Sequence, residues 1–264
     1  MKFLIQKING EIRHDFTFAL LESVRFKNWL NRNDKNDKIK VKFLDYIEVT
    51  EPNDIYPIQF KPCHKNYVPV GSVEFVTEFL SHFYGLTPKP INVPECLFDV
   101  RYSQRPIING NHMDLENRRG KWFVKSNEKI KGFAEVLRLD ENHVWNIPAG
   151  HYQISEYITI DSEWRTFVFE GKIVGLKHYS GEFIKFPQIQ SISNMVSAYE
   201  KSGTAPVAYT LDVGVNDYHT FVVEIHDFFS CGLYGFADYA KLPNMLSKWF
   251  YQYLQREMVK NYKP

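Results

Sequence analysis

The segment that most constrains this chain covers residues 211–235 and reads LDVGVNDYHTFVVEIHDFFSCGLYG. Two mostly apolar runs flank an Asn-Asp pair at 216–217, which is typical of the tight turn of a β-hairpin. The predicted hairpin brings the acidic residues of its two strands together. Carboxylates in such a position repel each other unless a cation lies between them, and oxygen ligands suit Mg²⁺ that is bound jointly with phosphates. The four candidate metal ligands are Asp212, Glu224, His226 and Asp227.

A nucleotide site is therefore one interpretation of this hairpin, and a surface hairpin with solvated acidic residues is the other. The net charge does not favour nucleic acid as a partner, because 32 Lys and Arg residues balance 31 Asp and Glu residues. The 264 residues are 44% hydrophobic, as in a globular protein that can bury a sizeable core. We therefore expect a globular protein with no nucleic-acid partner.

The first ten residues, MKFLIQKING, contain an apolar run that is too short for a signal peptide or a membrane span. The three cysteines, Cys63, Cys96 and Cys231, lie far apart and form no CxxC pair, so neither a disulfide framework nor a zinc cage is expected. We therefore expect a cytoplasmic protein with no membrane partner.

The hydrophobic periodicity predicts helices and strands in both halves of the chain, which indicates an α/β class, or α+β in looser terms. Ser72 is expected to cap one helix and Gly85 to end it. The proline-rich segment 87–94 suits a connection, and from about residue 121 the pattern is mostly β. We place a domain boundary near residue 115, giving domains 1–115 and 116–264. The remaining predicted helices cover residues 16–30, from 191 or 193 to about 203, and 239–262, and the first predicted strand covers residues 2–8.

Three cationic residues occupy positions at which they can face one ligand. Lys125 ends a predicted strand, and a turn near Gly171 places Arg165 almost opposite Lys177 on paired strands. Arginine offers a bidentate fork for phosphate oxygens and lysine a point charge, so these residues and the acidic group together suit a polyphosphate. The alternative is that each cation belongs to a surface ion pair, for example between Arg165 and Glu163 or Glu170.

This combination resembles the ATP-grasp superfamily of carboxylate-amine ligases. The resemblance covers residues 121–235 and rests on FVKS, ISEYITIDSEWRTFVFEGKIVGLKHY, LDVGV and VVEIHDFFSCGLYG. The upstream segments PVGSVEFV and INVPECL also resemble a bacterial and viral branch that is noted for one arginine and two lysines. The resemblance implies an ATP-grasp fold in which two lobes enclose the nucleotide, preceded by an N-terminal pre-ATP-grasp lobe.

The resemblance also implies roles for individual residues. Lys125 matches the lysine that contacts the α- and β-phosphates, and Lys131 lies in the expected phosphate-covering loop, which is poor in glycine here. Arg165 and Lys177 match the catalytic pair that faces the transferred phosphate. The backbone of the hinge 155–158 is expected to recognise adenine. The remaining cofactor-binding residues are Glu156, Tyr157 and Ile158 of the hinge and Glu163, with Glu156 or Glu163 on the ribose.

The metal site departs from the family pattern. Asp212 and Glu224 match the two acidic ligands, but the family has Glu-x-Asn where this chain has Glu224-Ile225-His226. Imidazole is a poorer ligand than an amide oxygen for Mg²⁺ and a better one for Mn²⁺ or Zn²⁺, while Asp227 next to it is a further source of oxygen. ATP and Mg²⁺ are the expected cofactors, with Mn²⁺ as an alternative metal.

The implied activity is ATP-dependent ligation of a carboxylate to an amine through an acyl phosphate, with release of ADP and phosphate. The substrates are a carboxylate and an amine of unknown identity, either of which can belong to a small molecule, a peptide or a protein tail. A non-catalytic ATP-binding or interaction protein that keeps the fold is the alternative, prompted by His226 and the glycine-poor loop.

Overall fold

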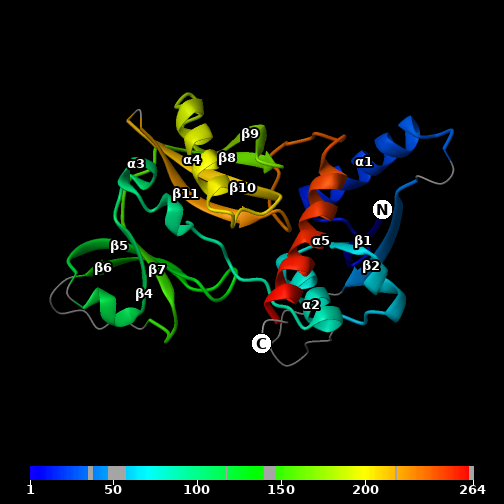
Figure 1. Cartoon of the computed structure of the whole chain (residues 1–264), viewed down its shortest axis with the longest axis horizontal. Coiled ribbons are helices and arrows are strands. Elements are labelled where there is room, and N and C mark those ends of the chain that lie inside the picture. The colour runs from blue at the N-terminus through cyan, green and yellow to red at the C-terminus, as the bar shows by residue number, and fades with distance from the viewer. Residues whose placement is uncertain (35–37, 47–57, 117, 140–146, 218, 262–264) are drawn as a thin grey trace. The chain divides into compact units, whose positions relative to one another are not determined.

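A computed structural model describes residues 1–34, 38–46, 58–116, 118–139, 147–217 and 219–261 (Figure 1). The chain forms two compact units. Unit 1 contains residues 1–87, 206–208 and 228–264, and unit 2 contains residues 88–205 and 209–227. The predicted domains 1–115 and 116–264 do not contain the same residues as these two units. The predicted division stays a prediction.

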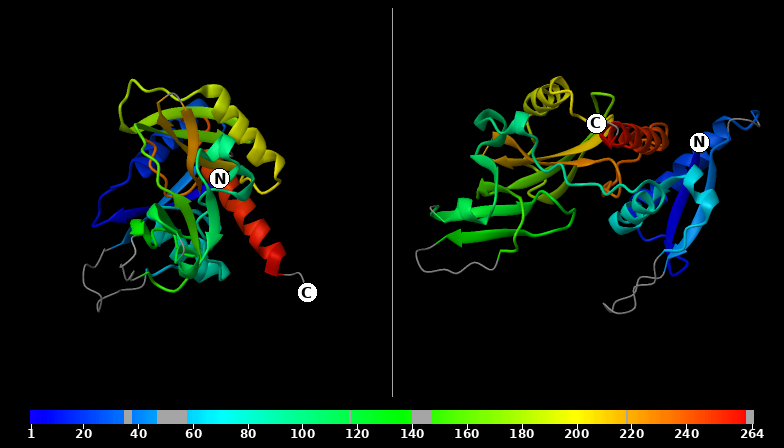
Figure 2. Two further views of the ribbon diagram at one scale, coloured as in Figure 1. Left: turned by 90° about the vertical axis from the view of Figure 1, so that its left-hand side faces the viewer. Right: turned by 60° about the horizontal axis from the view of Figure 1, so that its bottom comes forward.

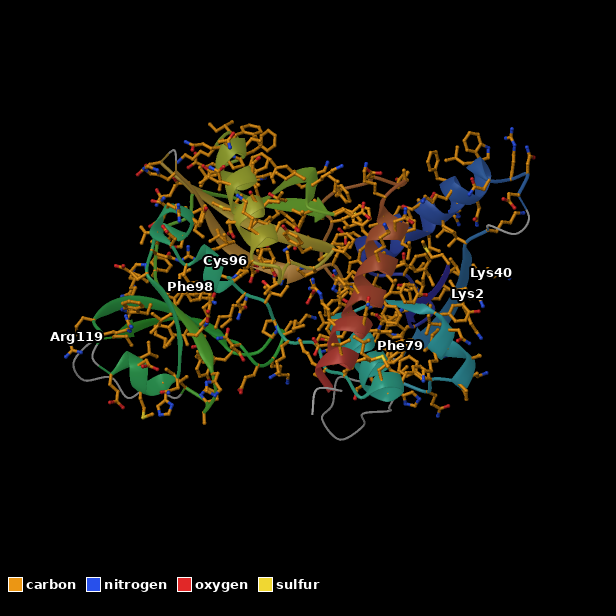
Figure 3. The ribbon with its side chains drawn as sticks, viewed as in Figure 1. Lys2, Lys40, Phe79, Cys96, Phe98 and Arg119 are labelled. Carbon is orange, nitrogen blue, oxygen red and sulfur yellow. The ribbon has the colours of Figure 1, made fainter. Side chains whose placement is uncertain are left out.

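Unit 1 contains a parallel sheet of three strands in the order β2-β1-β3. Strand β1 (Lys2–Ile8) is central and carries buried Phe3, Leu4 and Ile5, which confirms the strand predicted from the apolar run. Strand β2 (Lys40–Tyr46) pairs with it from Lys2 and Lys40 onward, as Figure 3 shows at the labelled lysines. Strand β3 (Val68–Val70) lies on the other side.

The helices of unit 1 are α1 (Asp15–Leu30), α2 (Val73–Tyr84) and α5 (Leu242–Asn261), with a 3₁₀ turn at Pro62–Asn66. Helix α2 begins and ends as predicted. The Ser72 hydroxyl accepts a hydrogen bond from the Phe75 N–H at 3.2 Å, and Gly85 closes the helix with a φ of 66°. The buried face of α2 includes Phe79, which is labelled in Figure 3. None of the helices within the described residues has the length and apolar character that a membrane span requires.

The first sheet of unit 2 is antiparallel and has the order β4-β7-β5-β6. Its apolar side chains, including Trp122, Val124 and Ile154, form a core of their own. Three short helical turns lie at Glu95–Leu97 (3₁₀), Val100–Ser103 (α3) and His112–Leu115 (3₁₀). The strands are β4 (Ile107–Gly110), β5 (Gly120–Ser126), β6 (Ala134–Leu139) and β7 (Tyr152–Glu156).

The second sheet of unit 2 has the order β11-β10-β8-β9 and consists of two hairpins. Helix α4 (Ile189–Lys201) packs on one face of it (Figures 1 and 2). Cys96 and Phe98, labelled in Figure 3, lie partly buried against the core between helix and sheet. The strands are β8 (Ser162–Phe169), β9 (Lys172–Gly181), β10 (Ala208–Asn216) and β11 (His219–Asp227).

Helix α4 begins at Ile189, earlier than a cap at Ser191 or Ser193 predicts. The N-cap residue is Gln188, whose side chain makes no capping hydrogen bond. Its backbone N–H instead donates to the Thr220 hydroxyl on β11 at 2.8 Å. A contact with a distant strand therefore fixes the start of this helix, and local capping chemistry could not reveal it.

Candidate functional site

The two hairpins of the second sheet bring the predicted catalytic and metal-binding residues together. Asp212 pairs in register with Glu224 on β10 and β11, and Arg165 pairs with Lys177 on β8 and β9. Directly opposed residues project to the same face of a sheet, so both predicted hairpins are confirmed. Each has a β-bulge between its turn and this pair, at Asp212/Val213 in one and at Phe167/Val168 in the other. The roles of the four opposed residues stay predictions.

A buried ion pair joins the two hairpins. Arg165 donates from Nε to Asp212 Oδ1 at 2.8 Å and from Nη2 to Asp212 Oδ2 at 2.7 Å. The side chain of Arg165 is 8% exposed and that of Asp212 is 1% exposed, so Asp212 is not a solvated surface carboxylate. A bidentate pair of this kind fixes the guanidinium and carboxylate planes relative to each other.

A second ion pair connects the two sheets of unit 2. The Lys125 ammonium, at the end of β5, donates to Glu224 Oε2 on β11. Burial lowers the pKa of Lys125 to about 8, while the Asp212 carboxylate opposes this shift. A lysine in such surroundings is stabilised as a cation by nearby negative charge, which a polyphosphate would increase.

Three side chains form a group suited to a divalent cation. One ligand atom each from Asp212, Glu224 and His226 lies within 4.8 Å of the others. The His226 Nε2 is 2.7 Å from Glu224 Oε1, and burial lowers the pKa of His226 to about 4 against the opposing effect of Asp212. The imidazole is thus neutral near pH 7, the form that binds metals. Two carboxylates and one neutral imidazole fit Mn²⁺ or Mg²⁺.

Asp227 does not belong to this group. In the described part of the chain, the close metal-ligating atoms come from the three residues above, and Asp227 follows His226 on β11. Successive strand residues project to opposite faces, so Asp227 is directed away from the face that carries His226. Its predicted role as a ligand stays a prediction.

A cavity of about 320 Å³ lies between the two sheets of unit 2. Phe123, Val136 and Ile160 supply apolar lining, and polar groups converge at one side, as in many small-molecule sites. This volume lies at the lower end of the range of about 300–1,000 Å³ that is usual for small-molecule pockets. The predicted site residues that line it are Lys125, Glu156, Tyr157, Ile158, Glu163 and Glu224.

The hinge backbone limits how adenine could be recognised. The N–H of Glu156 donates to the Pro106 carbonyl at 3.2 Å, and the N–H of Tyr157 donates to the Lys121 carbonyl at 3.0 Å. These two backbone donors therefore already have partners within the protein, and recognition of adenine by the hinge stays a prediction. Nearby, Glu163 accepts a hydrogen bond from the Tyr179 hydroxyl at 2.8 Å.

The sequence over residues 102–242, more than half of the chain, matches the family described as ATP-grasp domain, R2K clade family 2. The chain belongs to this ATP-grasp family. Together with the fold, this membership supports an ATP-dependent ligase. A comparison with curated proteins finds no match.

The ATP-grasp fold is also evident from solved structures. D-alanine–D-alanine ligase from Bacillus anthracis is 14% identical with a TM-score of 0.51, and the match covers 97% of this chain and 99% of that one. N5-carboxyaminoimidazole ribonucleotide synthetase from Thermotoga maritima is 10% identical with a TM-score of 0.51, covering 94% and 76%. A RimK domain ATP-grasp protein from Sphaerobacter thermophilus is 9% identical with a TM-score of 0.51, covering 97% and 100%. At these identities the likeness shows the ATP-grasp fold alone.

Several residues that line the cavity of this ATP-grasp domain were not predicted, and two of them are Arg105 and Asn92. Arg105 is 8% exposed and donates from Nη1 to the carbonyls of Ser103 at 2.9 Å and Val222 at 3.0 Å. Burial lowers its pKa to about 10, so it stays charged at neutral pH, and within the described residues it forms no ion pair with a carboxylate. Arg105 follows no periodic pattern or motif that could have identified it, whereas Asn92 lies in the segment INVPECL, for which the sequence indicated no chemical role.

Two further predicted residues of the ATP-grasp site lie outside the lining of the cavity. Lys131 belongs to the loop between β5 and β6 and has a φ of 55°. Lys177 is half-buried, and no ion pair is found for it in the part of the chain that the structure describes. Their predicted contacts with phosphate stay predictions.

Proposed function

We propose that the chain is a carboxylate-amine ligase that uses ATP to form an amide bond through an acyl phosphate. The observation that carries this proposal is the group of Asp212, Glu224 and His226 beside the cavity of an ATP-grasp fold, with Lys125 and Arg165 paired to its carboxylates. The substrates are a carboxylate and an amine of a small molecule, peptide or protein tail. A cytoplasmic location, with no nucleic-acid or membrane partner, belongs to the proposal.

In this proposal the nucleotide occupies the cavity. The base contacts the apolar lining and the hinge 156–158, and Glu163 or Glu156 binds the ribose hydroxyls. Lys125 and Lys131 contact the phosphates, and the buried cation Arg105 adds positive charge at the cavity wall. Fixed positive charge stabilises a transferring phosphoryl group more strongly in a buried site than in water.

The reaction proceeds in two steps. A carboxylate oxygen of the substrate attacks the γ-phosphorus of ATP, and the bond from this phosphorus to the bridging oxygen breaks, so that ADP leaves with the electron pair. An amine nitrogen then attacks the carbonyl carbon of the acyl phosphate. The bond from this carbon to the phosphate oxygen breaks, phosphate leaves, and the nitrogen loses a proton as the amide forms. Arg165 and Lys177 face the oxygens of the transferred phosphoryl group.

The metal contribution is electrostatic. A divalent cation held by Asp212, Glu224 and His226 would supply positive charge to the polyphosphate. When it binds, the carboxylates of Asp212 and Glu224 would share their charge between the metal and their present partners, Arg165 and Lys125. These lysine and arginine groups then gain the phosphate oxygens as additional partners.

Thermal unfolding with and without ATP and Mg²⁺ tests the proposed site. A ligand that binds the folded state at a hundred times its dissociation constant adds about 2.7 kcal/mol of stability, so the wild type is expected to melt at a higher temperature with ATP. Lys125→Ala and Glu224→Ala should each lose most of this shift. Lys40→Ala, an exposed lysine on β2, is the control and should keep it. An unchanged melting temperature of the wild type at millimolar ATP contradicts the proposal.

A non-catalytic ATP-binding or interaction protein is the second candidate, and His226 in the metal group is the observation that favours it. The two candidates differ in turnover. A ligase releases ADP when a suitable carboxylate and amine are added, so a screen of such pairs that yields ADP release excludes the second candidate. Nucleotide binding with no ADP release for any pair favours it.

His226 also predicts the preferred metal. Because imidazole suits Mn²⁺ better than Mg²⁺, the wild type should bind Mn²⁺ about tenfold more tightly than His226→Asn does, which corresponds to about 1.4 kcal/mol. Mg²⁺ binding should change less. Calorimetric titration of each metal measures this, with His219→Asn, an exposed histidine on the same strand, as the control. Equal loss of both metals in His226→Asn would show that the imidazole does not discriminate between them.

A further inference from the structure

A short segment, residues 91–93, links the two sheets of unit 2 beside the proposed phosphate site. On one side the Ile225 N–H of β11 donates to the Asn92 carbonyl at 2.7 Å. On the other side the Asn92 side-chain Nδ2 donates to the Ser126 carbonyl at 2.9 Å and to Asn127 Oδ1 at 2.7 Å. Asn92 is 2% exposed and lines the cavity. Asn92 thus contacts Ile225, which follows Glu224 on β11. It also contacts Ser126 and Asn127 at the end of β5, the strand that carries Lys125.

A second amide strengthens the link. Gln153 on β7 accepts from the Val93 N–H at 3.0 Å and donates to the Val93 carbonyl at 2.9 Å. Its side chain is 8% exposed, and its backbone pairs in register with Lys125 of β5. The segment 91–93 therefore contacts both β5 and β7 through side-chain amides, although it is not a strand of either sheet.

The hydrogen bonds of Asn92 continue through three further side chains in one direction. Asn127 Nδ2 donates to Asn109 Oδ1 at 3.0 Å, and Asn109 Nδ2 donates to Glu95 Oε1 at 3.1 Å. Each amide gives a hydrogen to the next oxygen, and the chain ends at a carboxylate that can only accept. An ionised acid at position 92 would remove the first donor and place a carboxylate oxygen against two acceptors, the Ser126 carbonyl and Asn127 Oδ1.

The backbone of Asn92 is held in an uncommon conformation. Its φ is 55°, in the left-handed region, and its Oδ1 is buried without a hydrogen-bond partner among the described residues. Both features cost free energy, and such costs persist where the surroundings fix the residue, often at functional sites. Asparagine tolerates this conformation better than other residues with a side chain, apart from aspartate.

We propose that Asn92 is a positioning residue that fixes the end of β5, and with it Lys125 and the start of the loop after it, relative to Glu224. This inference rests on the proposed function, because Lys125 and that loop are its proposed phosphate contacts. Asn92 does not need to touch the nucleotide. It acts through Ser126 and Asn127, the two residues that follow Lys125 and begin the loop.

Substitution by glycine isolates the side chain. Asn92→Gly keeps the left-handed backbone without strain and removes both donated hydrogen bonds. We expect amide exchange of a peptide covering residues 125–128 to become at least tenfold faster in the ligand-free protein. ATP affinity by calorimetry should fall about tenfold, which is about 1.4 kcal/mol. Asn92→Asp, which keeps the shape but loses the donor, should behave like Asn92→Gly or worse.

Two controls separate positioning from general stability. Asn9→Gly changes an exposed asparagine of unit 1 that also has a left-handed backbone, with a φ of 52°, and should change neither measurement. Asn127→Asp keeps an acceptor for Asn92 Nδ2 and should retain most of the exchange protection. In turnover assays Asn92→Gly should raise the KM for ATP more than it lowers kcat.

Wild-type exchange at residues 125–128 together with wild-type ATP affinity in Asn92→Gly would overturn the inference. Faster exchange with unchanged ATP affinity would also overturn it, since Asn92 would then be structural alone. If the wild type itself binds no ATP, the proposed function fails, and exchange alone decides whether Asn92 fixes the end of β5.

Discussion

Replacing Asp212 with alanine is expected to lower the free energy of unfolding of unit 2 by about 3–5 kcal/mol. The reason is the bidentate ion pair with Arg165, in which the side chains are 8% and 1% exposed. Removal of the carboxylate leaves a guanidinium buried without its counterion, and an uncompensated buried charge costs far more than an ordinary polar contact. The same variant also removes one ligand of the proposed metal site.

Hydrogen exchange of the core amides of β8 and β10 measures this loss, because amides in core strands generally exchange only when the whole unit unfolds. Glu182→Ala breaks a surface ion pair with Lys185 in the same unit and should leave the exchange nearly unchanged. The double variant with Asp212→Leu and Arg165→Met replaces the pair with apolar side chains and should recover most of the stability. If Asp212→Ala were no more destabilising than Glu182→Ala, the pair would not hold the two hairpins together.

Replacing Lys177 with alanine is expected to lower kcat by about 10²–10³-fold without lowering stability, by analogy with the removal of one donor that stabilises charge in a transition state. Lys177 lies opposite Arg165, is half-buried, and has no ion pair in the described part of the chain, so its removal leaves no unpaired charge behind. Its charge would act on the phosphoryl group as this group leaves ADP. The affinity for ATP should therefore change much less than kcat.

Initial rates of ADP release, once a substrate pair is found, measure the effect of Lys177→Ala. Lys172→Ala is the matched control, since it removes an exposed lysine from the start of the same strand. The control should retain wild-type kcat and melting temperature. A similar fall in kcat and in ATP affinity for Lys177→Ala would assign the residue to nucleotide binding and contradict its catalytic role.

The parts of the site that local chemistry determines could be predicted from the sequence. The turns expected at 216–217 and near Gly171 indicated two hairpins. A β-bulge in each of them, at Asp212/Val213 and at Phe167/Val168, then shifts the register by one residue and places Asp212 opposite Glu224 and Arg165 opposite Lys177. The helix from Val73 to Tyr84 was likewise evident from its cap and its terminal glycine. The family itself was evident from the same segments.

The remaining features depend on contacts between distant residues. Arg105 donates to a carbonyl 117 residues away, and Asn92 donates to one 34 residues away, so neither partner could be read from neighbouring positions. The pairing of Arg165 with Asp212 spans 47 residues and joins two hairpins whose mutual position no turn determines. The discontinuous course of unit 1 escaped prediction for the same reason, because residues 228–264 return to it after unit 2 is complete.

That return has a consequence for synthesis on the ribosome. All of unit 2 is translated before α5, and α5 packs against α1 and β3 of unit 1. Domains generally fold as units while the chain emerges, at about 5–20 residues per second. When all of unit 2 has been translated, residues 1–87 therefore still lack the packing of α5. The part with the cavity can reach its folded state first, although residues 1–87 of the other unit are translated before it.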